Sequence, residues 1–284
     1  MEPTATLLLH CRDRKGLVVA IGRFILEHGG NILHADQHQD DGMGLFFMRI
    51  KWSLEDFDLD QQSFAGAFAP LAAEYEFTWQ VVIGHKRPSV AIFVSRYQHC
   101  LVDLLYRHKA GELPCHLALV ISNHGDAHDL ANFYNVPFHH VPVSGSDKSA
   151  SEKEQISLLE EHQVELIVLA RYMQIFSPQF AARYRQKIIN VHHSFLPAFV
   201  GAKPYHAAFH RGVKLIGATS HYVTQVLDEG PIIEQDVIRI SHRDRVDDLI
   251  EKGRDLERVV LSRAVRWHLE QRILCYGNKT VVFD

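Results

Sequence analysis

The apolar run Val90-Ala91-Ile92-Phe93-Val94 decides the fold class of the larger part of this 284-residue chain. It shows no alternation of polar and apolar residues, which is typical of a strand buried on both faces. Leu117 to Ile121, Val164 to Ala170 and Ile188 to Val191 read the same way, and helical patterns separate them. Strands that alternate with helices in this manner predict a Rossmann-like, mostly parallel α/β sheet covered on both faces.

The helical patterns of this part have recognisable starts. Ser151-Glu152-Lys153-Glu154 resembles a capping box, and Ser177-Pro178 offers a cap with a first-turn proline. The remaining expected elements are helices over Tyr97 to His108, about Asp126 to Tyr134 and Arg245 to Leu274, an alternating strand over Thr219 to Val226 and an extended stretch over Pro231 to Ile240.

In a parallel sheet, ligands bind beyond the carboxyl ends of the strands. This rule predicts where the chemistry of the chain lies. The residues at those strand ends are Ser95, Ser122-Asn123, Arg171-Tyr172 and His192.

The N-terminal part follows a different order, strand-helix-strand-strand-helix-strand, which predicts a ferredoxin-like unit. A polar bridge, His85-Lys86-Arg87-Pro88, separates the two parts, so we expect one domain over residues 1–86 and a second over 87–284. The expected elements are Thr4 to Cys11, a helix from Leu17 that stops at Gly29-Gly30, Asn31 to His38, Leu45 to Trp52, Gln61 to Tyr75 and Thr78 to Ile83.

Bulk composition excludes several classes of protein. A net charge of −4 gives no reason to expect a nucleic-acid or anionic-membrane partner. There is no run of eighteen apolar residues, and the N-terminus lacks an apolar signal core. Four cysteines without a CxxC pair predict reduced thiols in a cytoplasmic protein. Glycine-rich nucleotide loops and a GxSxG elbow are also missing, so no nucleotide cofactor and no serine hydrolase is expected.

The twenty histidines raise the question of a metal. His139-His140 and His192-His193 are adjacent pairs, and neighbouring residues of a strand point to opposite faces. Neither pair is suited to hold one ion, and we expect no metal.

The densest polar stretch is Asn190-Val191-His192-His193-Ser194-Phe195-Leu196-Pro197. Asn190 and His192 are two residues apart, so on a strand their side chains share one face. Together with Asp228, in Leu227-Asp228-Glu229-Gly230-Pro231, they supply an amide, an imidazole and a carboxylate, a set suited to acyl transfer. Spacing alone leaves plainer interpretations open: a turn residue, a half-buried histidine and a turn former before Gly-Pro.

With these motifs the chain resembles the folate-dependent formyltransferase superfamily, which has an Asn-x-His element and a downstream Asp in an LDxG-type turn. Within it, the chain resembles the formyltetrahydrofolate deformylase family, an ACT domain followed by a formyl-transfer domain. The resemblance covers nearly all of residues 7 to 275. The narrower match rests on His193, where transferases usually have proline, on Val120-Ile121-Ser122-Asn123-His124 and on Leu169-Ala170-Arg171-Tyr172-Met173.

The resemblance implies an enzyme that hydrolyses 10-formyltetrahydrofolate to formate and tetrahydrofolate without a cofactor. Asn190 and His192 would stabilise the oxyanion, and Asp228 would position a water and accept its proton. The formate would feed purine synthesis and balance the one-carbon pool. By the same resemblance, the folate pocket is expected to be lined by Tyr172, Met173, Gln174, Ile175 and Phe176 on one wall and by Val223, Thr224 and Gln225 on the other.

For the N-terminal domain, the resemblance implies a regulatory and oligomerising ACT module. ACT domains commonly pair across a dimer and bind small amino acids there, so we expect a homo-oligomer, a dimer or tetramer. Asp13, Gly16 and Asn31 match the places where such ligands usually lie, although an empty oligomerisation domain is the alternative.

One departure bears on the acceptor of the formyl group. Ribonucleotide formyltransferases carry a glycine-rich loop after the first strand of this domain, whereas here it reads Val94-Ser95-Arg96-Tyr97-Gln98-His99-Cys100. A loop without glycine cannot close its backbone on a phosphate in the same way, which leaves water as the acceptor. The competing hypotheses are a formyltransferase with an unknown amine acceptor and a regulatory folate-binding module without catalysis.

Overall fold

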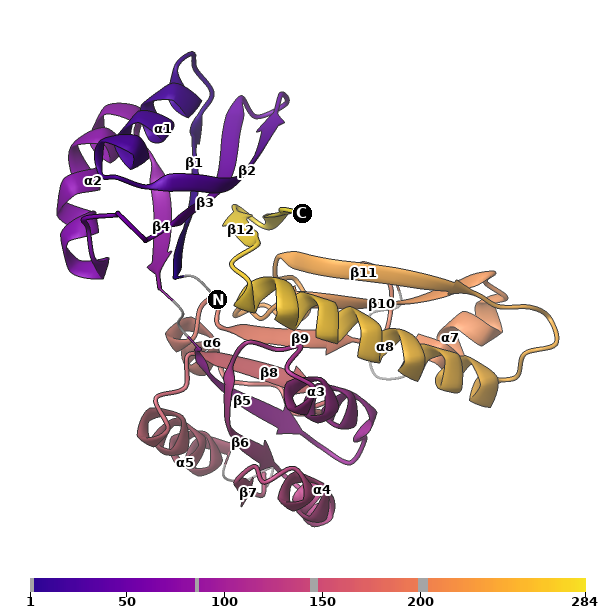
Figure 1. Cartoon of the computed structure of the whole chain (residues 1–284). Coiled ribbons are helices and arrows are strands. Elements are labelled where there is room, and N and C mark those ends of the chain that lie inside the picture. Colours follow the sequence, from indigo (N-terminus) through magenta and orange to yellow (C-terminus); the bar gives the residue numbers. More distant parts are fainter. Residues whose placement is uncertain (1–2, 85–86, 144–147, 199–203) are drawn as a thin grey trace. The chain divides into compact units, whose positions relative to one another are not determined.

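The computed structural model describes residues 3–84, 87–143, 148–198 and 204–284 (Figure 1). It divides into two compact units, one of Met1–Lys86, Gln271–Tyr276 and Val281–Asp284, the other of Arg87–Glu270 and Gly277–Thr280. Residues 85–86 at the expected domain boundary, and residues 199–201 after the polar stretch, lie outside the described residues.

The first unit has the expected ferredoxin-like order. Its four-stranded antiparallel sheet has the strand order β2-β3-β1-β4, and both helices cover one face (Figure 1). Ile21 and Phe24 of the first helix pack with Phe64 and Phe68 of the second in one buried cluster. The elements are β1 (Thr4–Arg12), α1 (Leu17–Glu27), β2 (Asn31–Asp40), β3 (Leu45–Ser53), α2 (Gln61–Tyr75) and β4 (Thr78–Ile83).

The C-terminal residues form a hairpin, β12 (Ile273–Tyr276) and β13 (Lys279–Val282), that the sequence analysis missed. The expected helix through Leu274 is wrong, because the helix ends at Leu269 and Gln271 has a left-handed φ of 54°. Leu274 and Phe283 pack with Leu8 and Phe47 in a separate cluster of the first unit. Most of the hairpin therefore belongs with the first unit, whereas all of 87–284 was expected in the second domain.

The second unit is a seven-stranded sheet in the order β11-β10-β9-β8-β5-β6-β7. β5 to β9 run parallel, while β10 and β11 are antiparallel additions, so the mostly parallel α/β prediction is confirmed. The strands are β5 (Ser89–Val94), β6 (His116–Ser122), β7 (Phe138–His140), β8 (Leu166–Ala170), β9 (Ile188–His192), β10 (Leu215–Tyr222) and β11 (Ile232–Arg239).

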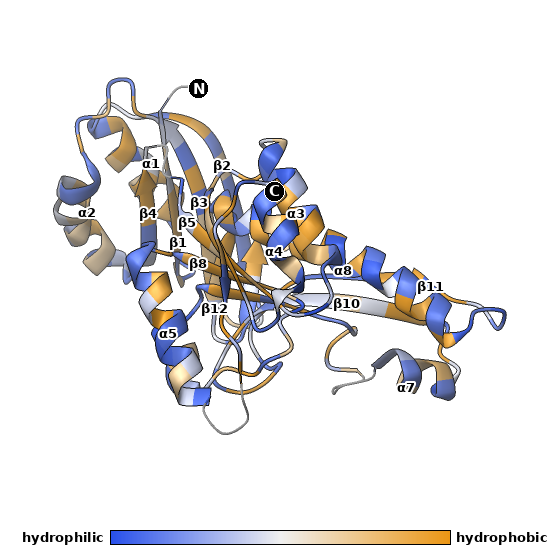
Figure 2. Ribbon diagram, turned by 90° about the horizontal axis from the view of Figure 1, so that it is seen from below, coloured by the Kyte–Doolittle hydropathy of each residue, from blue (hydrophilic) through white to orange (hydrophobic). Residues whose placement is uncertain are grey.

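Helices pack on this sheet, and the central strands are apolar along their length (Figure 2). The strand order reverses between β8 and β5, and such a switch point is where parallel sheets bind ligands. The helices are α3 (His99–Lys109), the short η1 (Gly125–Ala127), α4 (His128–Phe133), α5 (Lys148–Glu161), α6 (Pro178–Arg183), α7 (Pro204–Arg211) and α8 (Val246–Leu269).

The helix starts were predicted with mixed success. Ser177 caps α6 as expected, its side chain accepting a hydrogen bond from the N–H of Phe180. The capping box at Ser151 is wrong, because α5 begins at Lys148 and the Ser151 hydroxyl donates to the carbonyl of Pro142 instead. β7 and α7 were not expected. No helix among the described residues is long and apolar enough to cross a membrane.

α8 packs on β10, where Nδ1 of His268 lies 2.7 Å from the hydroxyl of Tyr222. Burial lowers the pKa of His268 to about 4. The unfolded chain binds this proton near its ordinary pKa of about 6.5, so the free energy of unfolding should fall by about 3 kcal/mol between pH 6.5 and 4. Urea unfolding at pH 6.5 and pH 4 measures this loss, and His268→Gln should flatten it. A variant with the full wild-type pH dependence would contradict the assignment.

Candidate active site

Asn190 and His192 lie on β9, and an unpredicted residue, His221, joins them from β10. In the antiparallel ladder Asn190 is paired with His221, and His192 with Thr219. Directly paired residues point to the same face of a sheet. The amide and both imidazoles therefore face one side of the two strands, and Asp228 reaches them from the turn after β10.

The carboxylate of Asp228 lies between the two imidazoles. Its Oδ2 is 3.3 Å from Nδ1 of His192, and its Oδ1 is 3.7 Å from Nε2 of His221. Burial by itself would raise the pKa of Asp228, but hydrogen bonds and attraction from His192 and His221 outweigh it and hold the pKa below its usual range. Asp228 is thus a carboxylate at neutral pH.

A tight turn brings Asp228 back over β10. Asp228 has a left-handed φ of 57°, and the N–H of Tyr222 donates to the carbonyl of Pro231 across 2.9 Å. Gly230 is needed here, because a Cβ at that position would come within 1.7 Å of the Tyr222 carbonyl oxygen. The sequence Asp-Glu-Gly-Pro therefore folds onto the strand and carries the carboxylate to the histidines.

The polar atoms of Asn190, His192 and His221 that do not face Asp228 show which hydrogen-bonding groups the site offers a ligand. Nε2 of His192 is buried and has no hydrogen-bond partner among the residues that the structure describes. Nδ1 of His221 lies 2.9 Å from the carbonyl of Tyr222, and its Nε2 lies 3.2 Å from Nδ2 of Asn190. This contact orients the Asn190 amide and leaves its second N–H for a ligand.

Two of the expected strand ends, Ser95 and Asn123, meet, and Met173, the residue after Tyr172, joins them. The Ser95 hydroxyl, after β5, donates to Oδ1 of Asn123 after β6 at 2.7 Å. The backbone N–H of Met173, after β8, donates to the same hydroxyl at 3.0 Å. Ser95 thereby fixes where the segment after β8 begins.

A buried carboxylate, Glu257 of α8, lies behind the site. Tyr205 donates to its Oε1 at 2.6 Å, Nε2 of His99 is 2.7 Å from Oε2, and Nε of Arg171 is 3.4 Å from the same oxygen. Burial opposes ionisation, but these partners lower the pKa of Glu257. The ring of His193 lies 5.9 Å from the ring of Tyr205, so His193 faces this network.

His99, Cys100 and Glu257 are the one group among the described residues with metal-ligand spacing, their ligand atoms lying within 4.8 Å of one another. The group suits a metal poorly. Both oxygens of Glu257 already have hydrogen-bonding partners, and burial raises the pKa of the Cys100 thiol well above its usual value. The sequence-based expectation of no metal stays a prediction.

Comparison with known proteins identifies the family. The sequence profile "Formyl transferase" matches residues 88–265, and the ACT domain profile matches residues 5–51. The formyltetrahydrofolate deformylase of Synechocystis sp. is 52% identical over 280 residues, covering 99% of this chain and 98% of that protein. The chain belongs to the formyltetrahydrofolate deformylase family.

Two further members of the family agree over the full length. The formyltetrahydrofolate deformylase of Bacillus subtilis is 47% identical and the alignment covers 100% of this chain and 95% of that protein. A crystal structure of the formyltetrahydrofolate deformylase from Pseudomonas syringae pv. tomato superimposes with a TM-score of 0.97 at 47% identity, covering 100% and 95% of the two chains. The predicted order of an ACT domain and a formyltransferase-type domain is confirmed.

The two segments expected to form the folate pocket of this deformylase family member come together. Tyr172, Phe176 and Val223 belong to one apolar cluster, and Phe176 stacks on Phe180 with ring centroids 4.0 Å apart. These side chains are mainly core. Met173 and Ile175 are 48% and 59% exposed and remain available to a ligand. Gln174 and Thr224 are half-buried and Gln225 is exposed.

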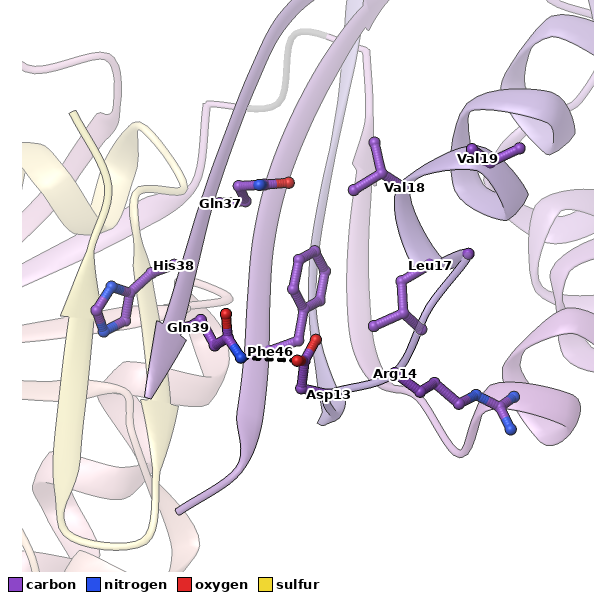
Figure 3. A pocket seen from close by; sticks show the side chains of 10 residues that line it. Asp13, Arg14, Leu17, Val18, Val19, Gln37, His38, Gln39 and Phe46 are labelled. Carbon is purple, nitrogen blue, oxygen red and sulfur yellow. Dashed lines mark hydrogen bonds between the residues drawn. The ribbon is translucent and has the colours of Figure 1, made fainter. Parts of the chain in front are cut away.

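The first unit contains a cavity of about 300 Å³ between α1 and the strands β2 and β3 (Figure 3). Gln39 donates to the Asp13 carboxylate at 2.7 Å, and His38 points to the opposite side (Figure 3). Of the three residues expected at an effector site, Asp13 and Gly16 line the cavity, whereas Asn31 is not among its lining residues. The lining residues are Asp13, Arg14, Gly16, Leu17, Val18, Val19, Gln37, His38, Gln39 and Phe46.

The turn that carries Asp228 gives a testable prediction. Gly230→Ala places a methyl group against the Tyr222 carbonyl, so we expect a loss of about 2 kcal/mol or more in the free energy of unfolding. Gly125→Ala is the control, because a Cβ there meets no atom within 4 Å. Urea unfolding of the two variants measures the difference, and equal stabilities would refute the close approach.

Proposed function

We propose that this enzyme hydrolyses 10-formyltetrahydrofolate to formate and tetrahydrofolate, with Asn190, His192 and Asp228 as its catalytic residues. One observation carries the assignment of roles: Nε2 of His192 is buried and without a partner among the described residues, while Nδ1 faces Asp228. A buried polar atom left unpaired costs about 1–3 kcal/mol, so such an atom at a sheet's ligand-binding edge marks a position for substrate. Similarity to deformylases over the full chain supports the choice of substrate.

Asn190 and His192 stabilise the oxyanion. Resonance makes a formamide carbonyl a poor electrophile, so the barrier depends on charge that develops on its oxygen. The free N–H of Asn190 faces the side where that oxygen would lie, and Nε2 of His192 becomes a second donor there once it has taken the proton of the water. A donor fixed in advance, as Asn190 is, stabilises the tetrahedral intermediate without reorganising during the reaction.

The proton of the attacking water goes to the His192–Asp228 pair. Asp228 was expected to accept this proton, but a carboxylate whose pKa is held low is by itself a weak base. With Asp228 accepting from Nδ1, Nε2 of His192 takes the proton as water attacks the formyl carbon. The same proton passes to N10 when the carbon–nitrogen bond breaks, which releases tetrahydrofolate and formate.

The side chains after β5 support water as the acceptor. Ser95 is committed to Asn123 and Met173, and His99 to Glu257. The loop thus lacks glycine and also uses these two polar side chains internally, so it offers no cradle for a phosphorylated amine.

We test the activity by following formate release from 10-formyltetrahydrofolate with no amine present. Asn190→Ala should lower kcat about 10²–10³-fold, the usual effect of losing one oxyanion donor. Asp228→Asn should lower it by about 10³–10⁴, because the tautomer of His192 is no longer fixed. Asp129→Asn, at an exposed carboxylate, is the control.

Absence of formate release by the wild type would eliminate water as the acceptor. Asn190→Ala or Asp228→Asn with wild-type turnover would eliminate the role of that residue alone.

We further propose that the first unit is a regulatory and oligomerising domain that binds a small amino acid in its cavity. Asp13 would receive the ammonium group, while Leu17 and Val18 offer apolar contacts. The enzyme would act as a homo-oligomer in the cytoplasm, need no cofactor, supply formate for purine synthesis and balance the one-carbon pool.

Titration with glycine and methionine tests the effector site. We expect one of them to raise the melting temperature and change kcat, and Asp13→Asn to weaken its binding about tenfold or more because a charge-assisted hydrogen bond is lost. Asp41→Asn, at an exposed turn, should bind like the wild type. If neither amino acid alters stability or activity, the domain is an oligomerisation module with an empty cavity.

A further inference from the structure

The β12–β13 hairpin is divided between the two compact units. Gln271–Tyr276 and Val281–Asp284, its base, belong to the unit that contains the ACT domain, while Gly277–Thr280, its tip, belongs to the catalytic unit. A two-stranded hairpin of this size is not stable by itself in water. Its conformation therefore depends on what holds it at each end.

The tip is bound to the segment that follows Asp228. The Asn278 amide donates to the carbonyl of Glu229 at 2.8 Å, and the Thr280 hydroxyl donates to the carbonyl of Ile232 at 2.6 Å. These carbonyls bracket Gly230 and Pro231, the residues that close the turn on Tyr222. The tip thus holds both ends of the turn whose left-handed residue is Asp228.

The base is bound to the sheet of the first unit, on the face away from its helices. Leu274 and Phe283 are 6% and 2% exposed in a cluster with Leu8 and Phe47, and the ring of Tyr276 lies 4.5 Å from that of Phe47. This base is apolar and firmly packed, so the hairpin has a fixed origin in the first unit.

The same strands form the wall of the ACT cavity. Phe46 of β3 lines the cavity, and its neighbour Phe47 points to the hairpin face. His38 of β2, between the cavity residues Gln37 and Gln39, stacks on Phe47 with ring centroids 6.0 Å apart. A change of β2 or β3 at the cavity acts directly on the side chains that hold the hairpin.

From these contacts we propose that Asn278 and Thr280 are positioning residues for Asp228, and that the first unit governs turnover through the hairpin that carries them. The proposal rests on the catalytic role proposed above for Asp228. It adds a route from the regulatory domain to the reaction. This route consists only of the contacts that the hairpin makes within each unit.

Thr280→Val tests the tip, because it keeps the shape and strand preference of threonine and removes the hydroxyl. We expect kcat for formate release to fall about five- to tenfold with KM unchanged, since loss of one partly buried hydrogen bond loosens the turn without touching folate. Thr280→Ser keeps the donor and should stay within about twofold of wild type. Asn278→Asp, which replaces the donating amide by an acceptor of equal size, gives a second and independent measurement.

Phe283→Leu tests the base, with Phe77→Leu as its matched control: both phenylalanines are buried in the first unit, but Phe77 packs on the helix side. Both variants should lower the melting temperature, and only Phe283→Leu should lower kcat. In the double variant with Thr280→Val, the Phe283→Leu effect on kcat should disappear, since both act through one hairpin.

Wild-type kcat in both Thr280→Val and Asn278→Asp overturns the proposal, and so do independent, multiplying effects of Phe283→Leu and Thr280→Val. If Asp228→Asn is inactive, either result leaves the catalytic role of Asp228 intact and rules out only the proposed role of the hairpin. If Asp228→Asn is active, both the catalytic role of Asp228 and the role of the hairpin are ruled out.

Discussion

A single carboxylate shared by two imidazoles organises the catalytic unit. Asp228 reaches His192 and His221 only because its own backbone adopts a left-handed conformation and the following Gly-Pro folds onto β10. In return, the histidines keep that carboxylate charged in a half-buried place. The turn and the histidines support each other, since a buried charge needs partners and a residue with a left-handed backbone needs surrounding contacts.

The antiparallel addition of β10 to a parallel sheet is what makes the shared carboxylate geometry available. A parallel neighbour would leave the sheet by a crossover, whereas β10 runs back along β9 and brings His221 directly opposite Asn190. The turn after β10, which carries Asp228, then lies close to His192 and His221. The proposed catalytic set thus comes from two adjacent strands and one turn.

Most of the order of strands and helices was readable from periodicity, because buried parallel strands and amphipathic helices leave strong patterns, whereas the short β7 and α7 were not. Asn190, His192 and Asp228 were singled out by their motifs as the expected catalytic residues, and the structure places His192 and Asp228 in contact. His221 was not singled out, although the alternation Thr219-x-His221 placed it on one face of an expected strand. Its partner depends on antiparallel register, which a sequence does not show. The hairpin was missed for a similar reason: Ile273 and Leu274 continue the helical spacing of α8, and what decides their conformation is packing on Leu8 and Phe47, far away in the chain.

The folding of the first unit has an evolutionary consequence. Its buried cluster on the hairpin face is made from both extremes of the sequence, Leu8 and Phe47 near one and Leu274 and Phe283 near the other. A recombination event that exchanged or removed the ACT domain at the bridge near residue 87 would separate these partners and expose large apolar side chains. Exchange of the ACT domain alone is thereby disfavoured. A replacement domain would have to bring partners for Leu274 and Phe283 with it.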